Sequence, residues 1–167
     1  MYNNCNWLSE PLSVTDPIND DDVEKLYRMY ISELRDSEYT FRGKVVRYRS
    51  NPPYAGKDEG FFHIIAGYSC KPIDLIRARR LLWGKEIILN EKCGYLDIEK
   101  CCEGIWVWKS DKNESGKERV YLFHPKVNYI VILEEKSDHW LYITSYKITG
   151  TNKRSELKLE YKRKKWL

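Results

Sequence analysis

The sequence W-L-Y-I-T-S-Y-K-I at residues 140–148 is the stretch that best indicates how this chain folds. Its β-branched and aromatic residues predict a β-strand, in which successive side chains point to opposite faces. Strict alternation gives two sets: Leu141, Ile143 and Ser145 on one face, and Trp140, Tyr142, Thr144 and Tyr146 on the other. We expect the first set, which is short and mostly apolar, to face the core.

The second set carries hydroxyl groups on large or branched side chains. A hydroxyl that faces a dry core must find a partner or cost about 1–3 kcal/mol. This face therefore holds either a cross-strand hydrogen-bonding pair or part of a functional site. The alternative is that these residues only decorate a sheet face that water covers.

Three further strands are expected upstream of this one, separated by short polar turns. They are residues 105–109, 119–123 and 129–134. Four apolar-rich strands with short connections predict an antiparallel meander. Residues 41–49 form a further strand candidate that basic residues interrupt, and residues 61–66 fit either a short buried strand or the start of a helix.

Helices are expected mainly before the meander. Apolar residues recur at helical spacing over residues 21–35, and Pro72 is suited to begin a second helix over residues 73–89. A terminal helix is expected from Lys153 to Lys165. The pattern predicts an α+β domain over residues 21–167, in which the N-terminal helices pack on one face of an antiparallel sheet and leave the other open. Residues 1–20 read as an extended lead-in.

Charge is distributed unevenly along the chain. Lys and Arg number 29 against 25 acidic residues, and the formal net charge is +4. The C-terminal end is basic, with its densest run at Lys162, Arg163, Lys164 and Lys165, whereas residues 16–24 are acidic. This end either contacts a polyanion or forms the solvated face of a terminal helix.

Metal and membrane signals are weak in this sequence. Of the five cysteines, Cys93, Cys101 and Cys102 cluster, but no Cys-x-x-Cys pair supplies the common zinc spacing with His124 or His139. No apolar run approaches the roughly 18 residues of a transmembrane helix, and no signal peptide is evident. We therefore expect a cytoplasmic protein with reduced thiols and without a metal, a cofactor or a membrane partner.

The residues that remain for chemistry are one histidine, two arginines and the hydroxyls of the last strand. His63 follows a loop rich in Gly and Pro, and Arg77 and Arg80, three residues apart on the expected helix, should project together. A histidine can take the proton of an RNA 2′-hydroxyl, and arginine can stabilise charge that develops on phosphate. The competing interpretation is a buried core histidine and two solvated arginines.

Three short motifs in order resemble a known superfamily. They are G-F-F-H-I at residues 60–64, R-A-R-R-L-L-W at residues 77–83 and Y-I-T-S-Y at residues 142–146. With the basic tail, they resemble phage- and prophage-encoded members of the barnase–EndoU–colicin–RelE-like superfamily of metal-independent ribonucleases. The resemblance implies helices followed by a four-stranded antiparallel sheet, with a site on the sheet.

By motif, the resemblance implies catalytic roles for His63, Arg80, Thr144 and Tyr146, and a helper role for Arg77. The tail residues 162–165 would bind substrate. The resulting hypothesis is an RNA-cleaving toxin or effector of phage–host conflict, with RNA and a protein antitoxin or inhibitor as partners. The alternatives are a non-catalytic nucleic-acid or protein-binding module of the same fold, and a structural phage component. The sequence does not indicate the oligomeric state.

Overall fold

The computed structural model describes residues 6–68, 71–93, 103–111, 116–164 and 166. Within these residues, six strands form one sheet in the order β1-β2-β6-β5-β4-β3. The strands are β1 Thr40–Phe41, β2 Lys44–Tyr48, β3 Trp106–Lys109, β4 Arg119–His124, β5 Tyr129–Glu135 and β6 His139–Lys147. The expected antiparallel meander is confirmed, because β3, β4, β5 and β6 pair antiparallel in sequence order.

The sheet as a whole is mixed, so the prediction of a purely antiparallel sheet is wrong. The expected strand over residues 41–49 is a hairpin of β1 and β2, turned by Arg42 and Gly43 at φ 45° and 84°. Such positive φ angles are typical of tight hairpin turns. β2 pairs parallel with β6, and the chain between them contains three helices and then β3, β4 and β5.

The first expected helix is confirmed. It comprises α1, Asp20–Met29, continued by a π-helical segment, Tyr30–Arg35. Asn19 caps it, since its side chain accepts a hydrogen bond of 2.9 Å from the Asp22 amide. The ambiguous residues 61–66 belong to a helix, α2, Glu59–Ile65.

The second expected helix is two helices, α3, Leu75–Ala78, and α4, Trp83–Leu89. Tighter i→i+3 hydrogen bonds separate them: the Arg80 amide donates to the Arg77 carbonyl, and the Trp83 amide to the Arg80 carbonyl. Arg77 therefore lies on a helix and Arg80 lies in the turn that follows, so the two side chains leave the backbone in different directions.

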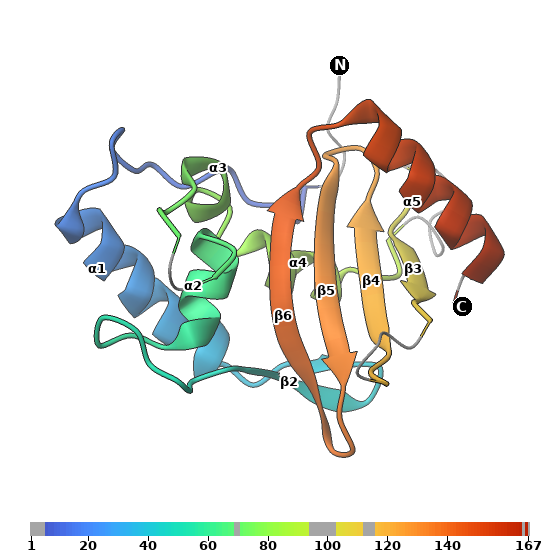
Figure 1. Cartoon of the computed structure of the whole chain (residues 1–167), viewed down its shortest axis with the longest axis horizontal. Coiled ribbons are helices and arrows are strands. Elements are labelled where there is room, and N and C mark those ends of the chain that lie inside the picture. Colours follow the sequence, from blue (N-terminus) through green and yellow to red (C-terminus); the bar gives the residue numbers. More distant parts are fainter. Residues whose placement is uncertain (1–5, 69–70, 94–102, 112–115, 165, 167) are drawn as a thin grey trace.

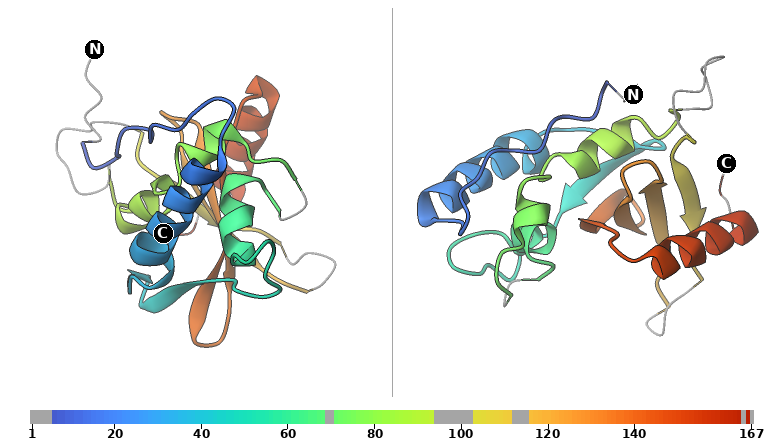
Figure 2. Two further views of the ribbon diagram at one scale, coloured as in Figure 1. Left: turned by 90° about the vertical axis from the view of Figure 1, so that its left-hand side faces the viewer. Right: turned by 90° about the horizontal axis from the view of Figure 1, so that it is seen from above.

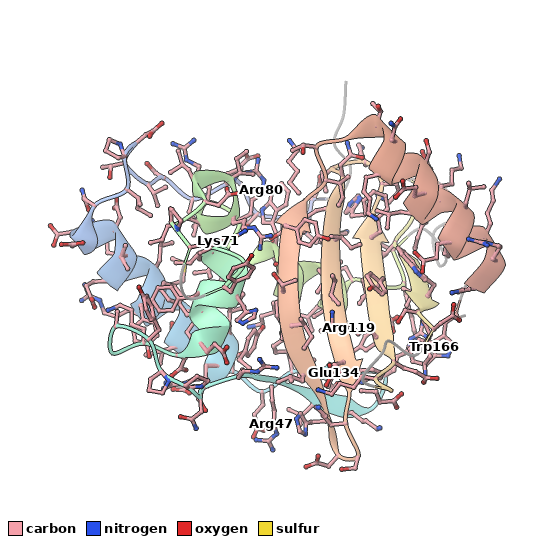
Figure 3. All side chains as sticks on the ribbon, viewed as in Figure 1. Arg47, Lys71, Arg80, Arg119, Glu134 and Trp166 are labelled. Atoms are coloured by element: carbon pink, nitrogen blue, oxygen red, sulfur yellow. The ribbon has the colours of Figure 1, made fainter. Side chains whose placement is uncertain are left out.

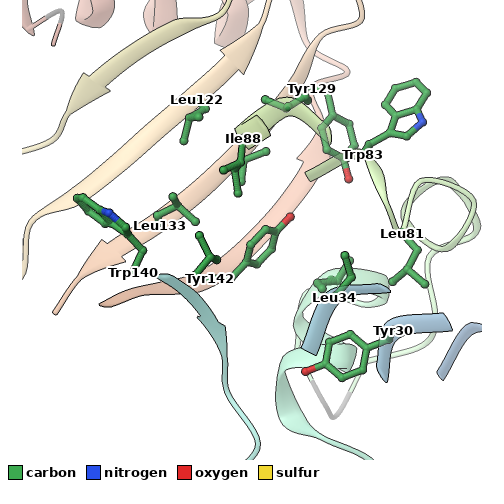
Figure 4. Packing of buried hydrophobic residues seen from close by; sticks show 14 of the residues in the cluster. Tyr30, Leu34, Leu81, Trp83, Ile88, Leu122, Tyr129, Leu133, Trp140 and Tyr142 are labelled. Carbon is green, nitrogen blue, oxygen red and sulfur yellow. The ribbon is translucent and has the colours of Figure 1, made fainter. Parts of the chain in front are cut away.

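The sheet separates two apolar clusters. On one face, α4 packs behind the strands, and α2 lies beside β6 with α1 further out (Figure 1, Figure 2). Figure 4 shows this larger cluster, where Leu122, Leu133 and Tyr142 of the strands meet Ile88 and Trp83 of α4.

The opposite face is only partly open. α5, Thr151–Lys164, crosses the β3 side of it in Figure 1. Leu157 is buried there, and Tyr161 stacks on Trp106 at 5.2 Å between ring centroids. The part of this face that lies between α2 and α5 is thus a strip on β6, β5 and β4, which we call the open strip. No helix among the described residues is long and apolar enough to cross a membrane.

A β-bulge in β6 changes which of its side chains reach the open strip. Ile132 pairs with Thr144 and Leu133 with Tyr142, so Ile143 is an extra residue. Before the bulge, Trp140 and Tyr142 face the helices, contrary to strict alternation. Ile143 faces the second cluster and not the helices, which corrects its expected side as well.

After the bulge, Thr144 and Tyr146 lie on the open side and Ser145 on the helix side, as expected. Ser145 is fully buried, and its hydroxyl lies 3.0 Å from the Tyr129 hydroxyl. Tyr142 instead reaches α4, where a Cβ at Gly84 would lie 1.8 Å from its hydroxyl oxygen. Only glycine leaves room for Tyr142 at this point.

Candidate functional site

A small pocket opens where α2 meets the open strip. Its volume is about 80 Å³, and its lining residues are Arg49, Gly60, His63, Arg119, Tyr142 and Ile143. We call it the basic pocket. Its size fits a single group such as a phosphate and not a whole nucleotide. It draws on segments that are far apart in the sequence: the end of β2, helix α2, the start of β4 and the bulge of β6.

Close backbone contact at Gly60 sets the position of Arg49 next to His63. The Gly60 amide donates a 2.7 Å hydrogen bond to the Arg49 carbonyl. A Cβ at Gly60 would lie 2.8 Å from that same oxygen, closer than Cβ atoms come. A larger residue would therefore push the first turn of α2 away from β2 and open the pocket.

Glu59 holds the imidazole of His63 and also contacts Arg49. The His63 Nε2 atom lies 3.4 Å from Glu59 Oε1, one helical turn away, and Arg49 Nη1 lies 3.5 Å from Glu59 Oε2. The His63 side chain keeps 21% of its surface exposed, so substrate could reach it. A carboxylate beside an imidazole fixes the orientation of the ring. This arrangement suits a residue that accepts a proton during a reaction.

Arg119 forms the opposite side of the pocket and lies on the open strip beside Glu134 (Figure 3). Its Nε lies 3.9 Å from Glu134 Oε2, beyond hydrogen-bond distance, and has no hydrogen-bond partner among the described residues. The Arg119 side chain keeps 36% of its surface exposed, so an anion in the pocket can reach it.

Glu134 itself is buried beneath three cations. Burial alone would raise its pKa, but the hydrogen bond and charge of Lys136, with the charges of Lys117 and Arg119, lower the pKa below its usual value. The carboxylate therefore stays ionised and compensates part of the local positive charge. The cluster as a whole still contains more cations than anions.

Arg77 and Thr144 are joined in a hydrogen-bonded link between helix α2 and strand β6. The Thr144 hydroxyl donates to the His63 carbonyl at 2.7 Å and accepts from Arg77 Nη1 at 3.1 Å. The same Nη1 lies 3.3 Å from the carbonyl oxygens of both His63 and Ser145. Since these groups are already engaged, we assign Arg77 and Thr144 to positioning His63 and not to contacting phosphate.

Two other expected site residues differ in their placement. The ring of Tyr146 lies under the Arg77 guanidinium, with 4.9 Å from its centroid to Cζ, and so belongs to this link. Arg80 does not reach it: Arg80 Nη1 donates to the Ile76 carbonyl at 3.0 Å, and its guanidinium lies 4.8 Å from the Trp83 ring centroid. Figure 3 accordingly shows Arg80 beside α3, well away from Arg119.

The basic tail lies on α5, across the same sheet face. Lys162 and Arg163 are exposed, and Lys164 pairs with Asp111. Lys165 lies outside the described residues, as do Cys101 and Cys102. Among the residues that the structure describes, no group of three or more His, Cys, Asp or Glu side chains could hold a metal ion.

Sequence reasoning missed Arg49, Glu59, Arg119 and Glu134. A signal for Arg119 was present, because alternation along R-V-Y-L-F at residues 119–123 puts Arg119 on the face opposite Val120 and Leu122. Nothing in the sequence indicates that α2 lies beside this strip.

No protein family, no curated protein and no solved structure matches this chain.

Proposed function

We propose that this protein cleaves RNA at the basic pocket without a metal, by attack of the 2′-hydroxyl on the adjacent phosphate. The observation that carries the proposal is an accessible imidazole, held by a carboxylate, in a phosphate-sized pocket with an arginine on either side. A proton acceptor and two cationic donors are the groups that this reaction needs.

In the proposed reaction, His63 takes the proton of the 2′-hydroxyl, and the resulting oxyanion attacks phosphorus. The bond to the 5′-oxygen breaks, that oxygen takes up a proton from solvent, and a 2′,3′-cyclic phosphate remains. Glu59 stabilises the imidazolium that forms, while Arg49 and Arg119 donate hydrogen bonds to the phosphate oxygens. Thr144 and Arg77 keep His63 in place.

The exposed tail cations, Lys162 and Arg163, would add salt-dependent affinity for RNA without taking part in chemistry. A protein antitoxin or inhibitor would have to cover the basic pocket, and an acidic surface would suit that role. The setting that the resemblance implies, a toxin or effector in phage–host conflict, stays a prediction.

Incubation of the purified protein with total RNA, with and without EDTA, tests the proposal. Cleavage that proceeds equally in both conditions is expected. Cleavage that stops in EDTA and returns with magnesium or zinc would contradict a metal-independent reaction.

A second candidate function is RNA binding without cleavage. The observation that favours it is the extent of internal pairing, since Glu59 contacts both His63 and Arg49, and Thr144 is engaged with Arg77. An electrophoretic shift of RNA that stays intact would support this candidate over the enzyme.

A further inference from the structure

A second cavity lies on the helix side of the sheet, away from the open strip. Its volume is about 520 Å³, within the range of small-molecule sites. The lining residues come from three places: Asn6, Leu8, Ser9, Glu10 and Pro11 of the N-terminal segment, Trp83 of α4, and His124 at the end of β4 with Lys126 and Val127 of the turn that follows.

His124 is the unusual residue of this cavity. It is 0% exposed, and neither ring nitrogen has a hydrogen-bond partner among the described residues. Burial, with a smaller effect of Lys126, lowers its pKa to about 4, so the ring is neutral near pH 7. A neutral imidazole offers one N–H donor and one acceptor, and buried polar groups in proteins are almost always paired.

Of two aromatic rings near this site, Trp7 contacts His124 and Trp83 lines the cavity. The Trp7 ring lies 5.6 Å from the His124 ring at an angle of 33°. The Trp83 indole N–H is already used, since it donates to the Ser9 carbonyl at 2.8 Å, and the ring packs edge-on against Tyr129 (Figure 4). Trp83 therefore lines the cavity without a spare donor, and the Arg80 guanidinium lies 4.8 Å from the centroid of the same ring.

The N-terminal wall is fixed in place by hydrogen bonds. The amide and hydroxyl of Ser9 donate to Glu86 Oε2 at 3.0 and 3.1 Å. Further along, the Leu12 amide donates to the Arg79 carbonyl at 2.7 Å. The cavity is thus preformed, so a ligand would not have to order its wall on binding.

We propose that this cavity binds an uncharged aromatic heterocycle of nucleobase size, which hydrogen-bonds to His124 and stacks on Trp83. The indole of Trp83 in the lining favours a planar ring, and the neutral imidazole requires a ligand that carries both a donor and an acceptor. Glu10 and Lys126 contribute one charge of each sign to the lining, so nothing favours an ion. The inference does not depend on RNA cleavage at the basic pocket.

The test is a titration of the full chain with adenosine, guanosine, cytidine and uridine, with toluene as a ligand that cannot hydrogen-bond. Binding is followed by calorimetry and by the ¹⁵N signals of the histidine rings. At least one nucleoside should saturate the protein and shift the ring nitrogens of His124. His124→Phe, which keeps an aromatic ring, should weaken this binding at least about tenfold, whereas the matched variant His139→Phe should leave it unchanged.

Three results would overturn the proposal: no saturation by any nucleoside up to its solubility limit, equal affinity of His124→Phe, or equal affinity for toluene. Circular dichroism shows whether His124→Phe is folded. If it is not, the wild-type ring signals decide the question, because His124 nitrogens that none of the four nucleosides shifts would rule out the contact.

Discussion

His63 and His124 lie on opposite faces of one sheet and meet opposite surroundings. His63 is partly exposed, contacts the Glu59 carboxylate and has arginines on either side. His124 is fully buried, contacts the Trp7 ring and has two unpaired nitrogens among the described residues. The same side chain thus has two different surroundings, and the two proposals give it two different roles.

The difference teaches that charge and access, and not residue type, separate a proton acceptor from a recognition group. An accessible imidazole that a carboxylate orients suits proton transfer. An imidazole whose burial lowers its pKa to about 4 stays neutral and can serve only as a fixed donor and acceptor.

The largest effect is expected from His63→Gln. Loss of the proton acceptor should lower RNA cleavage by roughly 10²–10⁴-fold. His139→Gln is the matched control, because His139 is also partly exposed and pairs with a carboxylate, Asp138. Single-turnover rates of the two variants make the comparison; equal rates would show that His63 is not the base.

The next effect is expected from Arg119→Gln. If Arg119 stabilises charge on phosphate, its loss should lower the cleavage rate roughly 10²–10³-fold, as for other donors of this kind. Arg47→Gln is the control, since Arg47 is exposed at β2 and lies apart from Arg119 (Figure 3). A similar small loss in both variants would mean that Arg119 contributes only general positive charge.

His124→Phe should change how stability depends on pH. The pKa of His124 is lowered in the folded state from 6.5 to about 4, so between these values the unfolded chain binds more protons. The wild-type protein should therefore lose about 3 kcal/mol of unfolding free energy as pH falls from 6.5 towards 4. Urea unfolding at several pH values should show that the variant lacks this loss; parallel curves would place His124 in a solvated environment.

Smaller effects should separate the two sides of β6. Thr144→Val removes two hydrogen bonds of the link, the one donated to the His63 carbonyl and the one accepted from Arg77. At about 1 kcal/mol each, their loss should lower cleavage roughly five- to thirtyfold. Tyr146→Phe should also lower cleavage.

Ser145→Ala should leave cleavage unchanged and cost about 1 kcal/mol of stability, since Tyr129 loses a partner. The reverse pattern in rate and denaturation measurements would mean that Ser145 and not Thr144 supports the site.

The sequence was sufficient to predict the elements that depend on a local pattern of residues. The meander and the helix at residues 20–35 follow from alternation and helical spacing, and both are present. The side of Thr144, Ser145 and Tyr146 was also as expected.

Features that depend on long-range pairing could not be predicted from the sequence. The parallel pairing of β2 with β6 joins residues about ninety positions apart, and no local pattern encodes it. The bulge at Ile143 reverses the faces of Trp140 and Tyr142 because one strand holds an extra residue, which only the partner strand reveals. Arg49 and Arg119 meet His63 through these contacts, so the basic pocket could not be assembled from motifs alone.

The central claim is that RNA is cut by its own 2′-hydroxyl at the basic pocket. The most direct measurement is the chemical nature of the new 3′ ends, determined by mass spectrometry after incubation of RNA with the protein in EDTA. The account predicts 2′,3′-cyclic phosphate ends that are absent with His63→Gln. Intact RNA, new 3′-hydroxyl ends, or cyclic ends produced equally by His63→Gln would contradict it.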